Sequence, residues 1–374
     1  MTSAFQLPNE LWLQVFSFLS WKDKLSMRCT CSHFKQLLDE CRPLWRGFSV
    51  VLKDLSRYNR AFWRSLARRQ LDSVALREVR KRDLKLLSVW LPLLQALRLD
   101  SWRGNDVQEL KRFRHVHSLT LRACSDPLVN LDFLLPLGQQ LTQLSLCNVQ
   151  LASPPSQLLA SPPSQLLASL SRLTRLRSLV LHHNGCLKIP TLRGVLSQLV
   201  NLNSLSWTMI NYKKLPHDFF CPATDPGGHP LVVYADFLPS SLRSLTLCVD
   251  LQPEDLQVVS FRAPNLRHLH LEPWSSSSKL VRLLPQLFPG LRTLAIRHHH
   301  VSDEDFLGLH QLQHLNTLEV LDSFYRPDPK DPCRVVDEPS SRLLQLISDL
   351  QKLTNHKVRV LTSSHINLLP CGCV

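Results

Sequence analysis

A short apolar motif recurs along most of the chain and constrains its fold more than any other feature. It has the form apolar, two variable residues, apolar, one variable residue, apolar. Most neighbouring copies lie 22 to 26 residues apart. A repeat this short cannot bury its own apolar edge, so the copies must stack on one another. Copies begin at Leu71, Leu94, Val116, Leu141, Leu176, Leu202, Leu242, Leu266, Leu291 and Leu315, and a degenerate last copy lies around Val358 and Val360.

This period resembles that of leucine-rich repeat proteins, in which each copy contributes one short strand to a curved parallel sheet and a returning helix or turn. The resemblance implies an α/β fold: a short helical segment followed by a solenoid with its helices or turns on the outer face. The solenoid is expected over residues 51–374, as about 10 or 11 irregular repeats.

Three longer intervals predict insertions between repeats. The first, near 150–170, contains the octapeptide LASPPSQL twice in succession. The second, near 211–240, is rich in proline and contains Gly227 and Gly228, and the third, near 324–342, carries four prolines. Such composition favours loops, and long loops in a repeat protein are either mobile or used for binding.

The first fifty residues precede the repeats and predict three short helices. Pro8 can start the first helix, which has one wide apolar face. Ser20 followed by Asp23 is a capping-box pattern for the second helix, and Ser32 can cap the third. Helices this short leave much apolar surface exposed, which indicates a binding partner.

Residues 7–46 resemble an F-box, and the ordered set of positions carries the resemblance better than any single one. Thr30 and Phe34 depart from the pattern, because valine and tryptophan are usual there. The chain is thus similar to the F-box and leucine-rich repeat family, with the F-box over residues 1–50. The matching positions are Leu7, Pro8, Leu11, Val15, Phe16, Leu19, Lys22, Asp23, Leu25, Cys31, Leu44 and Trp45.

The resemblance implies a substrate-recognition subunit of a cullin–RING (SCF-type) ubiquitin ligase. The F-box would bind the Skp-type adaptor, and the repeats would bind a target protein to promote its ubiquitination and proteasomal degradation. Taken singly, each matching residue could equally be helical core. The positions that the resemblance assigns to adaptor binding are Leu7, Pro8, Leu11, Val15, Leu19 and Leu25.

Target-binding candidates lie beside the apolar residues of the repeat strands, because strand side chains alternate between the two faces of a sheet. The column just before the middle apolar residue is mostly small and hydroxylic. Larger polar residues occupy the next two columns, and a solvated sheet face explains roughly half of such residues. With His268 from the first column, the candidates are Arg98, Asp100, Arg122, His182, His270, Glu272, Arg297 and Glu319.

The chain is basic, with 44 Lys and Arg against 30 Asp and Glu and a net charge of +14. Half of this excess falls between Arg57 and Lys85, where Arg60, Arg64 and Arg68 recur at helical spacing. An acidic protein, a nucleic acid or an anionic membrane would be attracted. The pattern favours a solvated helical face over a nucleic-acid site, because no aromatic-plus-basic motif accompanies it.

The sequence predicts no catalytic residue, metal site or cofactor. The close cysteine pairs have one residue between them, unlike the Cys-x-x-Cys pairs of a zinc-bound RING, and His298, His299 and His300 favour a surface cluster. No apolar stretch is long enough to cross a membrane. The eleven scattered cysteines fit a cytoplasmic or nuclear protein with reduced thiols. Cys371 matches a prenylation position poorly, which favours an unmodified tail.

Two other functions remain open at this point. A leucine-rich repeat scaffold or inhibitor would bind a protein partner without causing degradation, and would work without the F-box face. A nucleic-acid binder would use the basic segment and would lose affinity steeply as salt rises.

Overall fold

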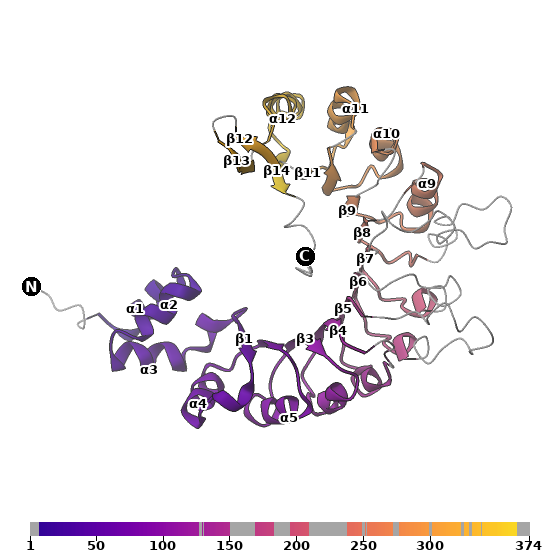
Figure 1. The fold of residues 1–374 in the computed structure, drawn as a ribbon. Helices are drawn as coiled ribbons and strands as arrows, with labels where there is room; N and C mark the ends of the chain where they lie inside the picture. Colours follow the sequence, from indigo (N-terminus) through magenta and orange to yellow (C-terminus); the bar gives the residue numbers. More distant parts are fainter. Residues whose placement is uncertain are drawn as a thin grey trace, which may run out of the picture. The chain divides into compact units, whose positions relative to one another are not determined.

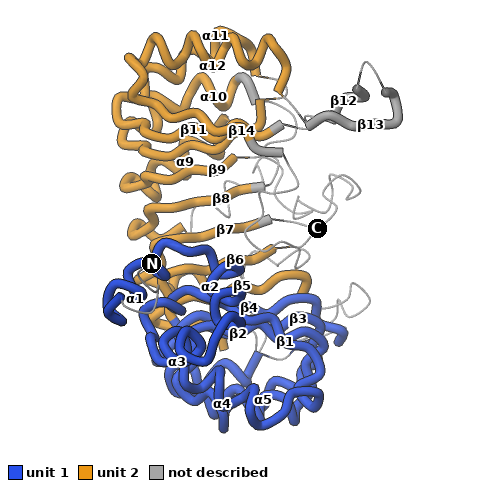
Figure 2. The backbone as a smooth tube through the Cα atoms, turned by 90° about the vertical axis from the view of Figure 1, so that its left-hand side faces the viewer, with its two compact units in different colours: residues 1–141 blue, residues 142–374 orange. Residues whose placement is uncertain are grey.

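The computed structural model describes residues 7–126, 129, 131–149, 169–182, 195–208, 238–248, 251, 253–271, 277–298, 301–322, 325–328, 331–337 and 339–364. The chain divides into two compact units, residues 1–141 and 142–374 (Figure 2). Within each unit, parallel strands form a sheet with helices on one face, in a solenoid-like α/β arrangement (Figure 1). The predicted boundary at residue 50 falls inside the first unit.

The first unit opens with three short helices, as predicted. They are α1 (Asn9–Ser17), α2 (Trp21–Arg28) and α3 (Ser32–Glu40). The Ser20 side chain accepts a hydrogen bond from the Asp23 backbone N–H, which confirms the expected cap. Ser32 was the wrong cap for α3: the extended residue before it, Cys31, accepts from the Phe34 N–H through its sulfur.

Four parallel strands follow in the first unit, each paired to the next or the previous one in sequence. The sequence motif does not predict the first strand, because Gly47, with φ +77°, stands where the other repeats have their first apolar residue. The elements are η2 (Arg42–Trp45), β1 (Ser49–Lys53), η3 (Leu55–Arg57), α4 (Arg60–Arg69), β2 (Ser73–Arg77), α5 (Lys81–Trp90), β3 (Ala96–Trp102), η4 (Asp106–Arg112), β4 (Ser118–Cys124) and η5 (Asp132–Leu137).

The second unit continues the same alternation. Its parallel strands are β5 (Gln143–Cys147), β6 (Ser178–His182), β7 (Ser204–Thr208), β8 (Ser244–Cys248), β9 (His268–Leu271), β10 (Thr293–Arg297), β11 (Thr317–Asp322) and β14 (Arg359–Ser364). The other elements are α9 (Pro253–Arg262), α10 (Ser277–Leu287), α11 (Asp303–Gly308), η9 (Leu309–Gln311), α12 (Ser341–Leu353) and an antiparallel hairpin of β12 (Tyr325–Asp328) with β13 (Asp331–Asp337).

The hairpin lies within the third predicted insertion. Residues 150–168 and 209–237, which cover nearly all of the first two insertions, lie outside the described residues.

Strand register confirms the repeat motif, because the middle apolar residues of successive copies stand directly opposite one another. In the second unit Leu245 pairs with Leu269, Leu269 with Leu294, and Leu294 with Leu318. All four are at most 2% exposed. Burying one leucine stabilises a fold by about 1.5–3 kcal/mol relative to leaving it in water. Stacked leucines therefore supply much of the stability of each sheet.

A left-handed residue stands at the same repeat position near the end of successive strands of the first unit, directly after β2 and one residue before the last of β3 and of β4. Glu78, Ser101 and Ala123 have φ values of 55°, 57° and 51°, each five positions after the first residue of its strand. The Glu78 N–H donates to the Asp100 carbonyl of the next strand at 2.9 Å. The left-handed backbone at this position is thus held by hydrogen bonds to the next strand, which continue with the Val79 N–H donating to the Ser101 carbonyl at 3.1 Å.

Candidate protein-docking site

An apolar face is exposed on the helices that open the first unit. Leu7, Leu11 and Val15 are 44–46% exposed, and Leu25 is 38% exposed. Pro8 is exposed and Leu19 is partly exposed. The structure therefore brings the six predicted adaptor-binding residues onto α1, its start and the following turn and helix, at least partly accessible to solvent.

Two further aromatic residues of the same segment are exposed and lie among the predicted residues in sequence. Phe18 is 82% exposed, and Trp21 is 37% exposed. Phe18 lies three residues after Val15 and seven after Leu11, so helical spacing could have identified it. We define the F-box face as Leu7, Pro8, Leu11, Val15, Phe18, Leu19, Trp21 and Leu25.

An aromatic cluster supports the face from beneath. Phe16 is fully buried, and its ring meets that of Phe34 edge to face at 5.3 Å between centroids. Trp12 completes the cluster, with its ring centroid 4.6 Å from that of Phe34. Phe34, one of the two departures from the usual pattern, is thus a packed core residue that joins α3 to α1.

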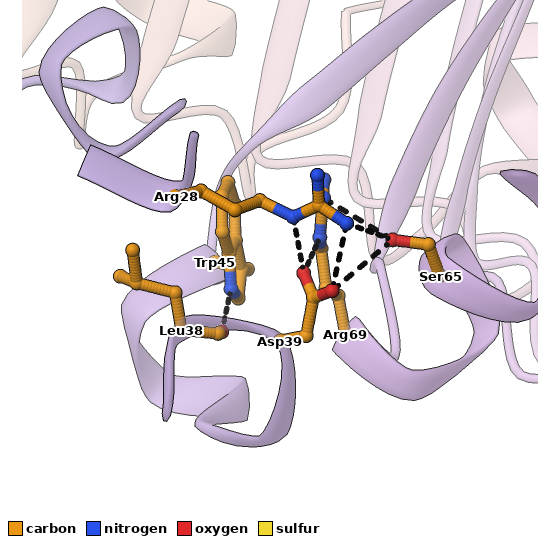
Figure 3. Close-up of polar contacts among 6 residues, drawn as sticks. All are labelled: Arg28, Leu38, Asp39, Trp45, Ser65 and Arg69. Carbon is orange, nitrogen blue, oxygen red and sulfur yellow. Dashed lines mark hydrogen bonds and ion pairs between the residues drawn. The ribbon is translucent and has the colours of Figure 1, made fainter. Parts of the chain in front are cut away.

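A buried carboxylate joins the helical segment to the first repeat (Figure 3). Asp39 on α3 accepts hydrogen bonds from Arg28 Nε at 2.8 Å and from Arg69 Nε at 2.7 Å. Arg28 also donates to the Ser65 hydroxyl at 2.9 Å. Arg69 and Ser65 both lie on α4, so this cluster ties α2 and α3 to the helix that precedes β2.

Burial and charge oppose each other in this cluster. Burial alone would raise the pKa of Asp39, but the hydrogen bonds from Arg28 and Arg69 outweigh it and hold the pKa below its ordinary value. Burial lowers the pKa of Arg69, against the opposing effect of Asp39. The Arg69 guanidinium also lies 4.4 Å from the centre of the Trp45 ring, whose Nε1 donates to the Leu38 carbonyl at 2.5 Å. We call Arg28, Asp39, Trp45, Ser65 and Arg69 the junction.

The predicted target-binding residues of the first unit lie together. Arg98 Nε is 3.0 Å from Asp100 Oδ1, and Arg122 Nε is 3.7 Å from the same oxygen. Asp100 and Arg122 are opposite residues on adjoining strands. The side chains are partly exposed, and the group forms a small polar patch on β3 and β4.

In the second unit the predicted target-binding residues differ in their exposure to solvent. His268 is exposed, and His270, Arg297 and Glu319 are partly exposed. His182 is fully buried, and its Nε2 lies 2.7 Å from the Ser206 hydroxyl of the neighbouring strand. The prediction that His182 is accessible to a target protein is therefore wrong, because its side chain is buried and contacts Ser206. Glu272 lies outside the described residues.

The basic segment is more varied than its sequence pattern indicates. Arg60, Arg64 and Arg68 are exposed on α4, as the helical-face interpretation predicts. Arg69 is buried in the junction instead. Its partner Asp39 lies 30 residues earlier, so no local spacing identifies it.

The described residues contain no group of three or more His, Cys, Asp and Glu arranged to hold a metal ion. His299, His300 and Cys371 lie outside this part of the chain. Within the same described residues, no helix is long and apolar enough to cross a membrane.

Residues 4–50 match the F-box-like family model. The chain therefore has an F-box-like domain followed by repeats of a strand and a helix or turn. No curated protein matches the sequence.

Similar solved structures include the Rad7 and Elc1 complex from yeast, at 14% identity over 99% of this chain and 97% of that chain, with a TM-score of 0.47. An internalin (inlF) from Listeria monocytogenes is 14% identical over 85% of this chain and 72% of that chain, with a TM-score of 0.31. The TLR13–ssRNA13 complex is 17% identical over 74% of this chain and 40% of that chain, with a TM-score of 0.39. At these values the likeness carries no functional inference.

Proposed function

We propose that this chain, an F-box-like domain followed by leucine-rich repeats, is a non-catalytic substrate-recognition adaptor of an SCF-type ubiquitin ligase. In this function the F-box face binds the Skp-type adaptor, and the repeat sheet binds a target protein. The result is ubiquitination and degradation of that target, in the cytoplasm or the nucleus.

The exposed apolar F-box face carries the proposal. Leucine, valine and phenylalanine side chains on one helix and its flanks remain in water although a packed aromatic cluster lies directly beneath them. Covering such a face gains about 25 cal/mol for each Å² of apolar surface removed from water. Helix faces of this kind bind in apolar grooves through residues spaced three, four and seven apart. Leu11, Val15 and Phe18 have this spacing.

Target binding is assigned to the polar residues of the sheet that are accessible. They are Arg98, Asp100 and Arg122 in the first unit and His268, His270, Arg297 and Glu319 in the second, with Glu272 proposed on its position in the repeat alone. The contribution to ubiquitination is positional: the chain raises the local concentration of a target near the ligase and breaks no bond itself.

The test is co-purification of the Skp-type adaptor and the cullin with the full chain from cells. Leu7→Ala, Leu11→Ala and Val15→Ala together should abolish recovery of both proteins. Val89→Ala with Leu93→Ala is the matched control, because these residues are 70% and 52% exposed in the same unit but lie outside the F-box face. The control variant should recover both proteins as wild type does.

Two results would overturn the proposal. One is a folded wild-type chain that recovers neither protein, and the other is equal recovery by the triple variant. In either case a scaffold or inhibitor that binds through the repeats becomes the leading explanation. Once adaptor binding is established, stabilisation of a repeat-bound protein by the triple variant in cells would identify a degraded target.

A further inference from the structure

One repeat position in the second unit is occupied by arginine far more often than packing requires. It lies immediately before the first residue of each strand. From β6 to β11 it holds, in strand order, Arg177, Asn203, Arg243, Arg267, Arg292 and Asn316.

Backbone hydrogen bonds hold these residues in register, in one row across the strands. The Asn203 N–H donates to the Arg177 carbonyl at 2.8 Å, and the same bond, again at 2.8 Å, joins Arg243 to Asn203 and Arg267 to Arg243. The Arg292 N–H continues the ladder to the Arg267 carbonyl, also at 2.8 Å. Neighbouring strands in a sheet are about 4.8 Å apart. Arg243, Arg267 and Arg292 therefore start from consecutive rungs, and Arg177 starts two rungs before them.

The four arginine side chains are exposed, and no described residue forms an ion pair with any of them. The turns that lead into these strands, residues 169–177, 195–203, 238–243, 263–267, 288–292 and 309–316, contain neither aspartate nor glutamate. Acidic residues gather instead at the starts of α9 and α11, which follow the other ends of the strands. These acidic residues therefore follow the ends of the strands opposite to the ends that carry the arginines.

Such a row does not help the fold. Like charges on neighbouring strands destabilise a sheet, while the leucines on either side of each arginine are buried and already supply the packing. Four like charges that start from fixed backbone positions are, however, well suited to a ligand that carries a row of negative charges, because the spacing of the four charges along the sheet is set before binding.

We propose that this arginine row, defined as Arg177, Arg243, Arg267 and Arg292, docks an extended acidic segment of a protein partner. The planar guanidinium group matches a carboxylate with two parallel hydrogen bonds. Acidic polypeptide is extended by its own charge repulsion. Nucleic acid fits less well, because these turns contain one residue among Phe, Tyr and Trp, namely Phe288, which is buried and cannot stack on a base. This surface is separate from the F-box face and does not depend on the ligase function.

The test uses the full chain and a short fluorescein-labelled peptide of consecutive glutamates, with binding followed by fluorescence anisotropy at low and high salt. Arg243→Gln, Arg267→Gln and Arg292→Gln together should weaken binding about tenfold or more, since three exposed charge contacts are lost. The matched control is Arg60→Gln, Arg64→Gln and Arg68→Gln on α4, which removes the same charge from another exposed surface. It should change the Kd less than twofold.

An equal loss of affinity in both variants would overturn the proposal, because it would show attraction to net charge rather than to the row. Absence of peptide binding by wild type at low salt would also overturn it. A labelled oligothymidine of matched charge serves as the competing ligand, and tighter binding of it to the row would indicate nucleic acid instead. Thermal unfolding followed by circular dichroism verifies that both variants are folded, and recovery of the Skp-type adaptor tests the F-box function separately.

Discussion

Regularly spaced apolar residues are exposed on the F-box-like helices and buried in the repeat strands. In the strands of the second unit, Leu245, Leu269 and Leu294 stand in register and are buried. On and after α1, Leu11, Val15 and Phe18 also have regular spacing, but 45–82% of their surface remains exposed. Regular apolar spacing therefore identifies an element and one of its faces. Whether that face forms the core or a docking surface depends on what the remainder of the chain can cover.

The largest expected effect separates the two kinds of leucine. Leu294→Ala should lower the free energy of unfolding by about 2–5 kcal/mol, because it leaves a cavity among stacked leucines. Leu11→Ala should lower it by less than about 1 kcal/mol, since the side chain is half exposed. Urea unfolding followed by circular dichroism measures both. Equal losses would contradict the division into architectural and docking leucines.

A smaller loss is expected at the junction. Asp39→Ala should destabilise the first unit by about 3 kcal/mol, because it leaves the buried Arg69 without its carboxylate. The double change Asp39→Leu with Arg69→Met should recover part of this loss, since an apolar pair needs no compensating charge. Hydrogen exchange on α3 and α4 provides the readout. Unchanged protection in Asp39→Ala would show that the junction does not hold these helices together.

The contribution of Asp39 to the stability of the fold should also depend on pH. The pKa of Asp39 is lower in the folded chain than in the unfolded chain, so its stabilising contribution is complete above the unfolded value near 4. The contribution is lost as the pH falls from there through the folded pKa. Unfolding free energies of wild type should therefore decrease below about pH 4 more steeply than those of Asp39→Asn. Parallel curves would assign the acid sensitivity to other groups.

The smallest effect concerns the left-handed turns. Ala123→Gly should raise the free energy of unfolding by about 0.5–1 kcal/mol, since alanine is strained at φ 51° and glycine is not. Ala75→Gly, in the middle of β2, is the control and should be destabilising. Thermal unfolding measures both changes. Destabilisation at both positions would mean that the turn at Ala123 carries no strain.

Local periodicity accounts for most of what the sequence predicts. The recurring leucines give the strands and their register, and the F-box pattern gives the helices and their exposed face. Strand β1 escapes because Gly47 interrupts the pattern at its first apolar position. The junction could not be predicted for another reason. Asp39 contacts Arg28 and Arg69, which are 11 and 30 residues away in sequence, and local periodicity does not indicate contacts between residues so far apart.

Side-chain burial is the other quantity that periodicity does not give. Strand alternation predicts that His182 lies on the same face of the sheet as His268 and His270, and the strand register agrees. Its burial depends on what packs over that part of the face, which alternation does not describe. The hydrogen bond to Ser206 is a consequence of that packing.

Under the proposed function, the junction would also set the geometry between the Skp-type adaptor and a target bound to the first repeats. Arg28, Asp39, Ser65 and Arg69 lock α3 against α4 through charge-assisted hydrogen bonds, so the linkage from the F-box face to the first repeat behaves as a rigid strut and not as a tether. A rigid strut fixes a separation, whereas a tether only limits it. If a target protein binds to β1 to β4, its orientation would then decide whether ubiquitin can be transferred to it. Inserting flexible residues into this linkage would lower the local concentration of the target near the ligase.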